Sequence, residues 1–278
     1  MDFTDGYFDT GEVRLHYIEG PKSGPPLVLM HGATSNCHDW EGLFPALSQH
    51  WHIYSLDVRG HGLSGRPATL EGYHLSHNVQ DTVAFLRGVV REPAVLMGHS
   101  YGAVIAALAG QPGADWLRGI VLEDPPLVLR RDNQESQAFL DFFTWMYQVR
   151  SLASTVEEIL PALSQQNPAA PVDSLRPWAQ TLAWLDPNYL LAITTGNKRE
   201  TAMNIDFAAH IAGIACPVLV MQADLAKGAA LMAEDLDFFM TNAKNARLVT
   251  FPGCGHGIHN EQTAAFLKAF EDFTTALA

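Results

Sequence analysis

Basic side chains and long apolar runs are both scarce in this sequence of 278 residues. Lysine and arginine number 17 against 30 aspartates and glutamates, which gives a net charge of −13. A chain this acidic repels phosphate backbones and anionic lipid surfaces, so we expect neither a nucleic-acid nor a membrane partner. No apolar run approaches the roughly 18 residues of a membrane span, and the acidic opening MDFTDGYFDT predicts no signal peptide.

Cysteine is also rare, and its spacing is informative. The chain has only Cys37, Cys216 and Cys254, an odd number at wide spacing with no CxxC pair. This pattern is typical of reduced thiols in a cytosolic protein rather than of a disulfide framework, so we expect a cytoplasmic location. The length suffices for one large α/β domain, which is compatible with a monomer or a homodimer.

The first 126 residues do contain a clear alternation of short apolar runs with helical patterns. The expected strands are Val13–Ile18, Leu27–Met30, His52–Leu56, Ala94–Met97 and Gly119–Leu122. Helical patterns lie between them at residues 39–48, 77–90 and 102–110. Several runs are continuously apolar, as expected for strands buried on both faces of a parallel sheet. The alternation predicts an α/β fold with a doubly wound, mostly parallel sheet.

Residues 127–205 differ, because they contain helical patterns broken by prolines and no convincing strand. The segment is rich in aromatic side chains: Phe139, Phe142, Phe143, Trp145, Tyr147, Trp178, Trp184 and Tyr189. Strand patterns return at residues 217–221 and 247–251, and a helical pattern at 261–277 closes the chain. We therefore expect a helical insertion, residues 127–205, between two parts of one α/β core, residues 1–126 and 206–278.

The stretch AVLMGHSYGAVIAALAG, residues 94–110, carries the strongest catalytic motif. It reads as a buried strand, then GHSYG, then a helix of small residues, which is the G-x-S-x-G nucleophile elbow. Ser100 must occupy a sharp, strained turn that lifts its hydroxyl above the sheet, and Gly98 and Gly102 remove side chains that would collide there. The following helix N-terminus directs amides toward the site. Ser100 is therefore the candidate nucleophile.

The sequence resembles the α/β-hydrolase superfamily, and the segments that carry the resemblance are spread over nearly the whole chain. The matching segments are LVLMHGATSN (27–36), SLDVRGHGLSGRP (55–67), GHSYG (98–102) and FPGCGHGIH (251–259), in the family's order and spacing. The resemblance implies that the insertion, residues 127–205, is a cap or lid over the active site. It also implies that the HG-x loop and the elbow supply the oxyanion hole, through the backbone amides of Ala33 and Tyr101.

A serine nucleophile needs an adjacent base, and the chain has 12 histidines to choose from. His256 lies in GCGHG, where the family places its catalytic histidine. His259, three residues later, is interpreted as a structural neighbour, and His61 as a packing or hydrogen-bonding residue. These three could be imagined as metal ligands, but no HExxH or Cys/His zinc spacing supports that. We expect no metal and no cofactor.

The third member of the triad is an acid that orients the histidine, and two positions compete for it. Most family members carry it after the strand that here reads VLVMQ, where Asp224 comes about two residues early. A minority carries it after the sixth strand, which here ends in GIVLEDPPL, with Asp124 at the matching position and Glu123 pointing the other way. That subgroup includes some dehalogenases, a resorcylic-lactone hydrolase and an acetamidomethylene-succinate hydrolase. We favour Asp124 and keep Asp224 as the alternative.

The nature of the nucleophile limits the reaction. Haloalkane dehalogenases and epoxide hydrolases of this family carry aspartate at the elbow, so Ser100 disfavours both activities. The sequence instead predicts a carboxylesterase-like serine hydrolase that forms an acyl-enzyme. Hydrolysis of an amide, a lactone or a C–C bond by the same triad stays open. So do a ligand receptor of the same fold and, less favoured, a cofactor-free oxygenase.

The aromatic insertion suggests a small apolar or aromatic substrate, although many of these side chains could equally form the insertion's own core. Candidates for lining the pocket are His31, Trp145, Met146, Tyr147 and Trp184. Arg130 and Arg131 are candidates for a carboxylate contact or a solvated pair.

Overall fold

An eight-stranded sheet forms the centre of the molecule, in the order β1-β2-β4-β3-β5-β6-β7-β8. The computed structural model describes residues 2–127, 137–195 and 206–277. The strands are β1 (Thr4–Asp9), β2 (Arg14–Glu19), β3 (Pro26–Met30), β4 (His52–Leu56), β5 (Ala94–His99), β6 (Leu117–Glu123), β7 (Val218–Gln222) and β8 (Ala246–Thr250). Strands β1 and β2 pair antiparallel, β2 pairs antiparallel with β4, and the other neighbours are parallel.

The strands with continuous apolar runs are the buried ones, which confirms the fold class expected from the sequence. Every residue of β3, β4 and β7 is buried. Strand β1 was not predicted, because its sequence TDGYFD is exposed or half-buried throughout and offers no apolar run. It lies at the edge of the sheet, where pairing with β2 requires no buried side chains.

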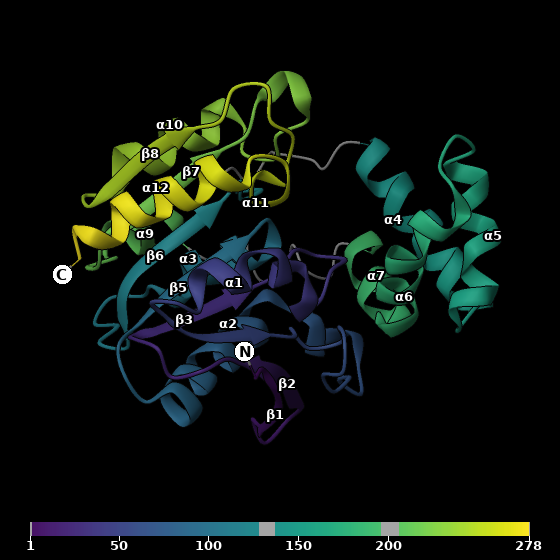
Figure 1. The fold of residues 1–278 in the computed structure, drawn as a ribbon, viewed down its shortest axis with the longest axis horizontal. Helices are drawn as coiled ribbons and strands as arrows, with labels where there is room; N and C mark the ends of the chain where they lie inside the picture. Colours follow the sequence, from purple (N-terminus) through teal and green to yellow (C-terminus); the bar gives the residue numbers. More distant parts are fainter. Residues whose placement is uncertain (1, 128–136, 196–205, 278) are drawn as a thin grey trace.

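Helices cover both faces of the sheet (Figure 1). One apolar cluster joins the sheet to α2 (Leu75–Phe85), α3 (Tyr101–Ala109), α9 (Phe207–Ala212) and α10 (Ala233–Asn242). The opposite cluster joins it to η1 (Cys37–Leu43), α1 (Phe44–Leu47), α11 (Ile258–Glu261) and α12 (Thr263–Thr275). Alternate residues of one strand point to opposite faces, so Leu96 of β5 belongs to the first cluster and Val95 and Met97 to the second. The short segments are η2 (Leu70–Tyr73), η3 (Leu86–Val90), η4 (Val172–Leu175) and η5 (Leu225–Lys227).

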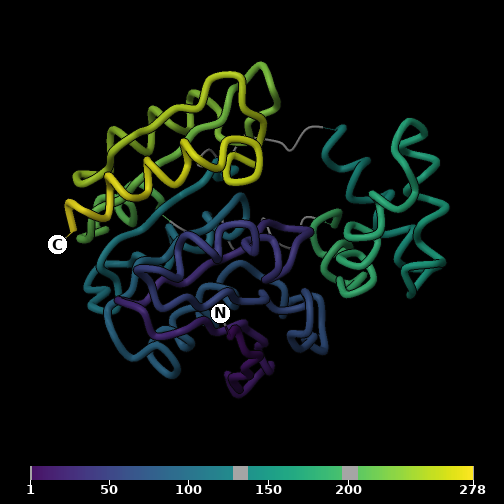
Figure 2. The backbone as a smooth tube through the Cα atoms, in the orientation of Figure 1, coloured from purple at the N-terminus to yellow at the C-terminus, as the bar shows by residue number. Residues whose placement is uncertain are grey.

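Four helices stand to one side of the sheet and are called here the helical lobe (Figures 1 and 2). They are α4 (Gln137–Leu152), α5 (Val156–Gln166), α6 (Arg176–Trp184) and α7 (Pro187–Thr194). The lobe has its own apolar cluster, with Met146, Leu182 and Tyr189 fully buried in it. Within the described part of the chain, no helix is both long enough and apolar enough to span a bilayer.

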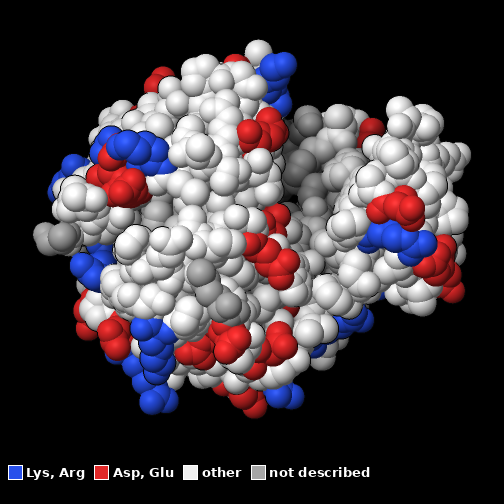
Figure 3. All heavy atoms as spheres, viewed as in Figure 1, with Lys and Arg blue, Asp and Glu red and all other residues white. Residues whose placement is uncertain are grey.

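The lobe contacts the core at loops that follow the carboxyl ends of the strands. The backbone N–H of Asp186 donates to the carbonyl of Gly60 at 2.8 Å, and the Tyr73 hydroxyl donates to the Asp186 carboxylate. The Asn36 amide donates to the Thr181 hydroxyl at 3.1 Å. Figure 3 shows a hollow between the core and the lobe on the face viewed. The lobe thus stands at the edge of the sheet where α/β enzymes bind ligands.

Candidate active site

Ser100 occupies a strained turn between β5 and α3. Its backbone has φ 52° and ψ −118°, a conformation that costs a residue with a side chain on the order of 1–3 kcal/mol. A Cβ added to Gly98 would lie 2.3 Å from the carbonyl carbon of Gly102, and one added to Gly102 would lie 2.4 Å from the carbonyl oxygen of Met30. The two glycines therefore allow the close backbone approach that raises the serine at the start of α3.

Asp124 and His256 form a direct pair beside this turn. The Nδ1 atom of His256 lies 2.6 Å from Oδ2 of Asp124. The carboxylate is fully buried, whereas the histidine side chain is 35% exposed. Because Nδ1 is engaged by the acid, Nε2 is the ring nitrogen left for another partner. The centroid of the His99 ring, one residue before Ser100, lies 4.6 Å from that of the His256 ring. The loop that carries His256 therefore packs against the turn that carries Ser100.

Asp124 is held by the loop that follows β7. Its oxygens accept backbone N–H groups from Ala223 at 3.3 Å, Ala230 at 2.7 Å and Leu231 at 3.3 Å. Its backbone has φ 42°, in the left-handed region that is uncommon for residues other than glycine. Buried carboxylates are retained where hydrogen bonds replace water, and here three backbone donors and an imidazole do so.

Asp224, the alternative acid, hydrogen-bonds to backbone groups and not to His256. Its oxygens accept the backbone N–H groups of Gly253 at 2.7 Å and Ala226 at 2.9 Å, and these hydrogen bonds lower the pKa of its carboxyl group. The backbone N–H of Asp224 donates to the carbonyl of Cys254 at 2.9 Å. Asp224 therefore fastens the end of β7 to the loop that leads to His256, and the pairing with that histidine is made by Asp124.

Ala33 and Tyr101 lie beside the elbow, next to the helical lobe. A Cβ added to Gly32 would come within 3.3 Å of the Cβ of Ser100, so the backbone before Ala33 is close to the serine. Ala33 and Tyr101 both pack against the apolar cluster of the lobe. The carbonyl of Ala33 lies 2.8 Å from Nε2 of His61, which fixes this loop to the segment after β4.

Both ring nitrogens of His31 form hydrogen bonds with backbone groups. Its Nε2 accepts the N–H of Val58 at 3.0 Å, so Nδ1 carries the proton and donates to the carbonyl of Gly32 at 2.7 Å. Burial lowers the pKa of His31, in keeping with a neutral ring. The residue is 1% exposed, and its two hydrogen bonds join the loop after β3 to the segment after β4.

The aromatic candidates for the pocket lie in the lobe at different depths. Met146 is fully buried in the lobe's cluster, while Trp145 and Tyr147 are half-buried at its border. The half-buried Trp184 ring lies 5.8 Å from that of His38 in the core. A substrate contact for these residues and for His31 stays a prediction. Arg130 and Arg131 lie outside the described residues.

A second buried acid–histidine pair adjoins the first and was missed from the sequence as a unit. Glu123, fully buried, lies 2.9 Å from Nδ1 of His259 and also accepts the backbone N–H of His259 at 2.8 Å. The signal was present, since the consecutive acids Glu123 and Asp124 match two histidines spaced three apart.

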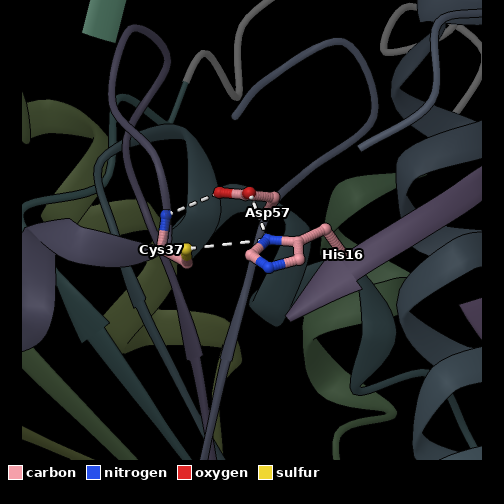
Figure 4. Close-up of side chains that lie close together, drawn as sticks. All are labelled: His16, Cys37 and Asp57. Carbon is pink, nitrogen blue, oxygen red and sulfur yellow. Dashed lines mark hydrogen bonds and ion pairs between the residues drawn. The ribbon is translucent and has the colours of Figure 1, made fainter. Parts of the chain in front are cut away.

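One group of described residues has the composition of a metal site: His16, Cys37 and Asp57 (Figure 4). Asp57 already accepts hydrogen bonds from the backbone N–H groups of Cys37 at 2.7 Å and Leu63 at 2.9 Å, and from Nδ1 of His16 at 2.7 Å. Burial, with the Asp57 charge nearby, raises the pKa of the Cys37 thiol, which disfavours a thiolate ligand. As arranged, the group ties η1 and the loop after β4 to strand β2.

A model of the alpha/beta hydrolase family matches residues 27–269. The chain belongs to the alpha/beta hydrolase family. This hydrolase is 27% identical to 2-(acetamidomethylene)succinate hydrolase of Mesorhizobium japonicum over 278 residues, which cover 96% of this chain and 94% of that relative.

Two further likenesses set the limits of that comparison. The hydrolase is 33% identical to epoxide hydrolase A of Mycobacterium tuberculosis, but the match covers 50% of this chain and only 44% of that relative. The crystal structure of E-2-(acetamidomethylene)succinate hydrolase superposes with a TM-score of 0.75 at 24% identity, covering 99% of this chain and 100% of the other. That structure shares the fold of this chain.

Proposed function

We propose that this hydrolase is a serine hydrolase that cleaves a carboxylic ester of a small apolar or aromatic substrate through an acyl-enzyme on Ser100. The observation that carries the proposal is the buried Asp124–His256 pair, whose loop rests on the strained turn bearing Ser100. A serine at this turn also separates the chain from the epoxide hydrolases it partly matches, which the family resemblance associates with an aspartate nucleophile.

In the proposed reaction His256 accepts the Ser100 proton on Nε2 while Asp124 holds Nδ1, which fixes the tautomer and stabilises the imidazolium. The serine oxygen attacks the substrate carbonyl, and the amides of Ala33 and Tyr101 stabilise the oxyanion. His256 then protonates the leaving alcohol. Water, deprotonated by the same histidine, attacks the acyl-enzyme, and collapse of the second tetrahedral intermediate releases the acid and restores Ser100.

The helical lobe serves in this proposal as the cap over the site. Two observations support that role: its apolar cluster packs on Ala33 and Tyr101, and its helix α7 is fastened to Gly60 beside the same edge of the sheet. An apolar wall next to a polar catalytic edge is the usual composition of a small-molecule site, so the acyl or leaving group of the substrate is expected to be apolar or aromatic.

A second candidate is hydrolysis of an amide, lactone or C–C bond by the same three residues. The observation that favours an amide is the likeness over nearly the full length to an enzyme named for 2-(acetamidomethylene)succinate. The residues that would distinguish a dicarboxylate from a neutral substrate include Arg130 and Arg131, outside the described part of the chain.

The test compares wild type with Ser100→Ala on p-nitrophenyl esters of short and aromatic acids, an anilide and a lactone. It also measures covalent labelling of Ser100 by a fluorophosphonate, with Ser151→Ala as the control for loss of an exposed serine hydroxyl. We expect wild type and the control to hydrolyse an ester and take the label, and Ser100→Ala to do neither. Labelling without turnover of any substrate would favour a receptor, and hydrolysis that survives in Ser100→Ala would refute the proposal.

A further inference from the structure

Next to the proposed triad lies a second set of ionisable side chains that the reaction does not use. It consists of the buried Glu123 and His259 and the half-buried Asp39 and His99, with the Trp40 ring stacked on His259 at a centroid distance of 4.4 Å. The side chains of Glu123 and His259 are 0% and 1% exposed. Buried charges are costly to retain, so a set like this needs an explanation beyond surface solvation.

We propose that Glu123 is a positioning residue, which acts through His259 to fix the loop that carries His256 against Asp124. This inference rests on the proposed function, because it assigns a role within the same site. Glu123 touches neither Ser100's hydroxyl nor the reacting atoms in this proposal. Its effect passes entirely through the backbone and ring of His259.

The geometry of the loop carries the inference. The two histidines of the loop GHGIH pair with two consecutive acids where β6 ends: His259 with Glu123, the last residue of the strand, and His256 with Asp124, which follows it. Glu123 accepts both the backbone N–H of His259, at 2.8 Å, and the ring Nδ1–H, at 2.9 Å. Two hydrogen bonds from one carboxylate fix the position and the orientation of His259, and with it the start of α11.

The other end of the loop is held from the elbow. Nε2 of His99 donates to the backbone carbonyl of His256 at 3.1 Å. His99, which precedes Ser100, and Glu123, which precedes Asp124, therefore hydrogen-bond to the loop on opposite sides of Gly257. Ser100 also donates its backbone N–H to the carbonyl of Glu123 at 2.9 Å. Glu123 and Asp124, where β6 ends, therefore contact or include all three proposed catalytic residues.

The carboxylates around His259 favour the protonated, positively charged form of its ring. Burial opposes its protonation, but hydrogen bonds and charge from Asp39 and Glu123 raise the pKa of His259 to about 10. Nε2 of His259 lies 3.8 Å from Oδ1 of Asp39, so the ring sits between two carboxylates. The Asn260 amide lies 2.9 Å from the same Nε2, and a half-turn of that amide presents its oxygen to a protonated ring. Burial lowers the pKa of His99.

The test replaces Glu123 with glutamine, which keeps the shape and one acceptor but removes the charge. Asp81→Asn is the matched control, because Asp81 is another buried carboxylate, paired with Arg59 at 2.7 Å, outside the proposed site. Three measurements are made on both: the rate of fluorophosphonate labelling, the steady-state kinetics (kcat and KM) for the best ester, and the far-downfield proton resonance of the His256 Nδ1–H. Folding is checked by a cooperative thermal transition.

We expect Glu123→Gln to lower kcat and the labelling rate about 10- to 100-fold with KM unchanged, because misplacement of a catalytic group by about 1 Å has effects of this size. The downfield resonance should broaden or vanish. Asp81→Asn should lose stability but keep all three. A folded Glu123→Gln that matches Asp81→Asn in labelling rate and resonance would overturn the proposal.

The test also covers a Glu123→Gln variant that does not fold and a wild type that takes no label. If Glu123→Gln does not fold, the double variant Glu123→Gln, His259→Gln, which removes both charges, decides by the same criteria. If wild type takes no label at Ser100, the proposed function fails; the resonance of His256 then still reports whether Glu123 positions it, and its survival in Glu123→Gln would overturn the inference.

Discussion

The carboxyl edge of the sheet and the helical lobe differ in the share of polar side chains among their buried residues. At the sheet edge, buried polar side chains are held by several hydrogen bonds each; Asp124 alone accepts three backbone N–H groups and faces an imidazole. In the lobe, α4–α7 surround an apolar cluster, and the lobe meets the core at a small set of loops near Gly60 and Tyr73. A site that moves protons needs fixed geometry, while a substrate pocket needs a shape that packing alone provides.

Both candidate acids lie at the sheet edge, after β6 and after β7, and the largest expected effect distinguishes them. Asp124→Asn should lower kcat/KM for the best substrate by about 10⁴, because an amide offers His256 the wrong hydrogen-bond partner and favours the wrong tautomer. Asp224→Asn should change it by no more than about twofold, since its carboxylate binds only backbone N–H groups. Steady-state kinetics of both variants measure the effect. A reversal of the two losses would return the acid to Asp224.

A smaller effect tests whether the helical lobe can unfold while the sheet core stays folded. Leu96 of β5 and Leu182 of α6 are both fully buried, one in the sheet core and one in the lobe. Truncation of either to alanine should cost about 2.7–5 kcal/mol, the range for buried leucines. We expect Leu96→Ala to destabilise the whole fold. Leu182→Ala should speed amide exchange in α4–α7 while Ser100 labelling by a small fluorophosphonate keeps its wild-type rate.

Hydrogen exchange followed by mass spectrometry resolves the two cases, because local opening releases only the peptides of the region that opens. Equal acceleration of exchange in core and lobe peptides by Leu182→Ala would mean that the two unfold as one cooperative unit. The contrast between them would then concern composition and not stability.

The same contrast explains what the sequence could predict. Parallel strands buried on both faces leave continuous apolar runs, so β3, β5 and β7 were located almost to the residue. The elbow was readable because sterics allow only glycine at Gly98 and Gly102. Edge strand β1 left no such trace, since its side chains are exposed and only its backbone pairs.

The candidate site was predictable to the extent that it is encoded locally. Asp124 and His256 are 132 positions apart, and only their places at the ends of two strands bring them together. The support around them was not readable, because it is made by backbone N–H groups of residues such as Ala223, Ala230 and Leu231, whose side chains carry no chemical signal. The aromatic residues of the lobe gave the least information, since a core position and a pocket position favour the same side chains.

A change in pH tests the charged pair formed by His259 and Glu123 at the sheet edge. The pKa of His259 is raised to about 10 in the folded protein, against about 6.5 in an unfolded chain. Between these values the folded state keeps a proton that the unfolded state has released, so the free energy of unfolding should fall as pH rises, by at most about 1.4 kcal/mol per unit. The contribution is complete below about pH 6.5 and is lost as pH approaches 10.

Urea unfolding of wild type and His259→Gln between pH 6.5 and 9.5 isolates this contribution, because the other titrating groups are common to both. We expect the free energy of unfolding of wild type to decline more steeply than that of the variant, with the two curves converging toward the alkaline end. Parallel curves would mean that His259 is neutral when folded. The Glu123 carboxylate would then be held by neutral donors alone, and the sheet edge would differ from the lobe in hydrogen bonding but not in buried charge pairs at this position.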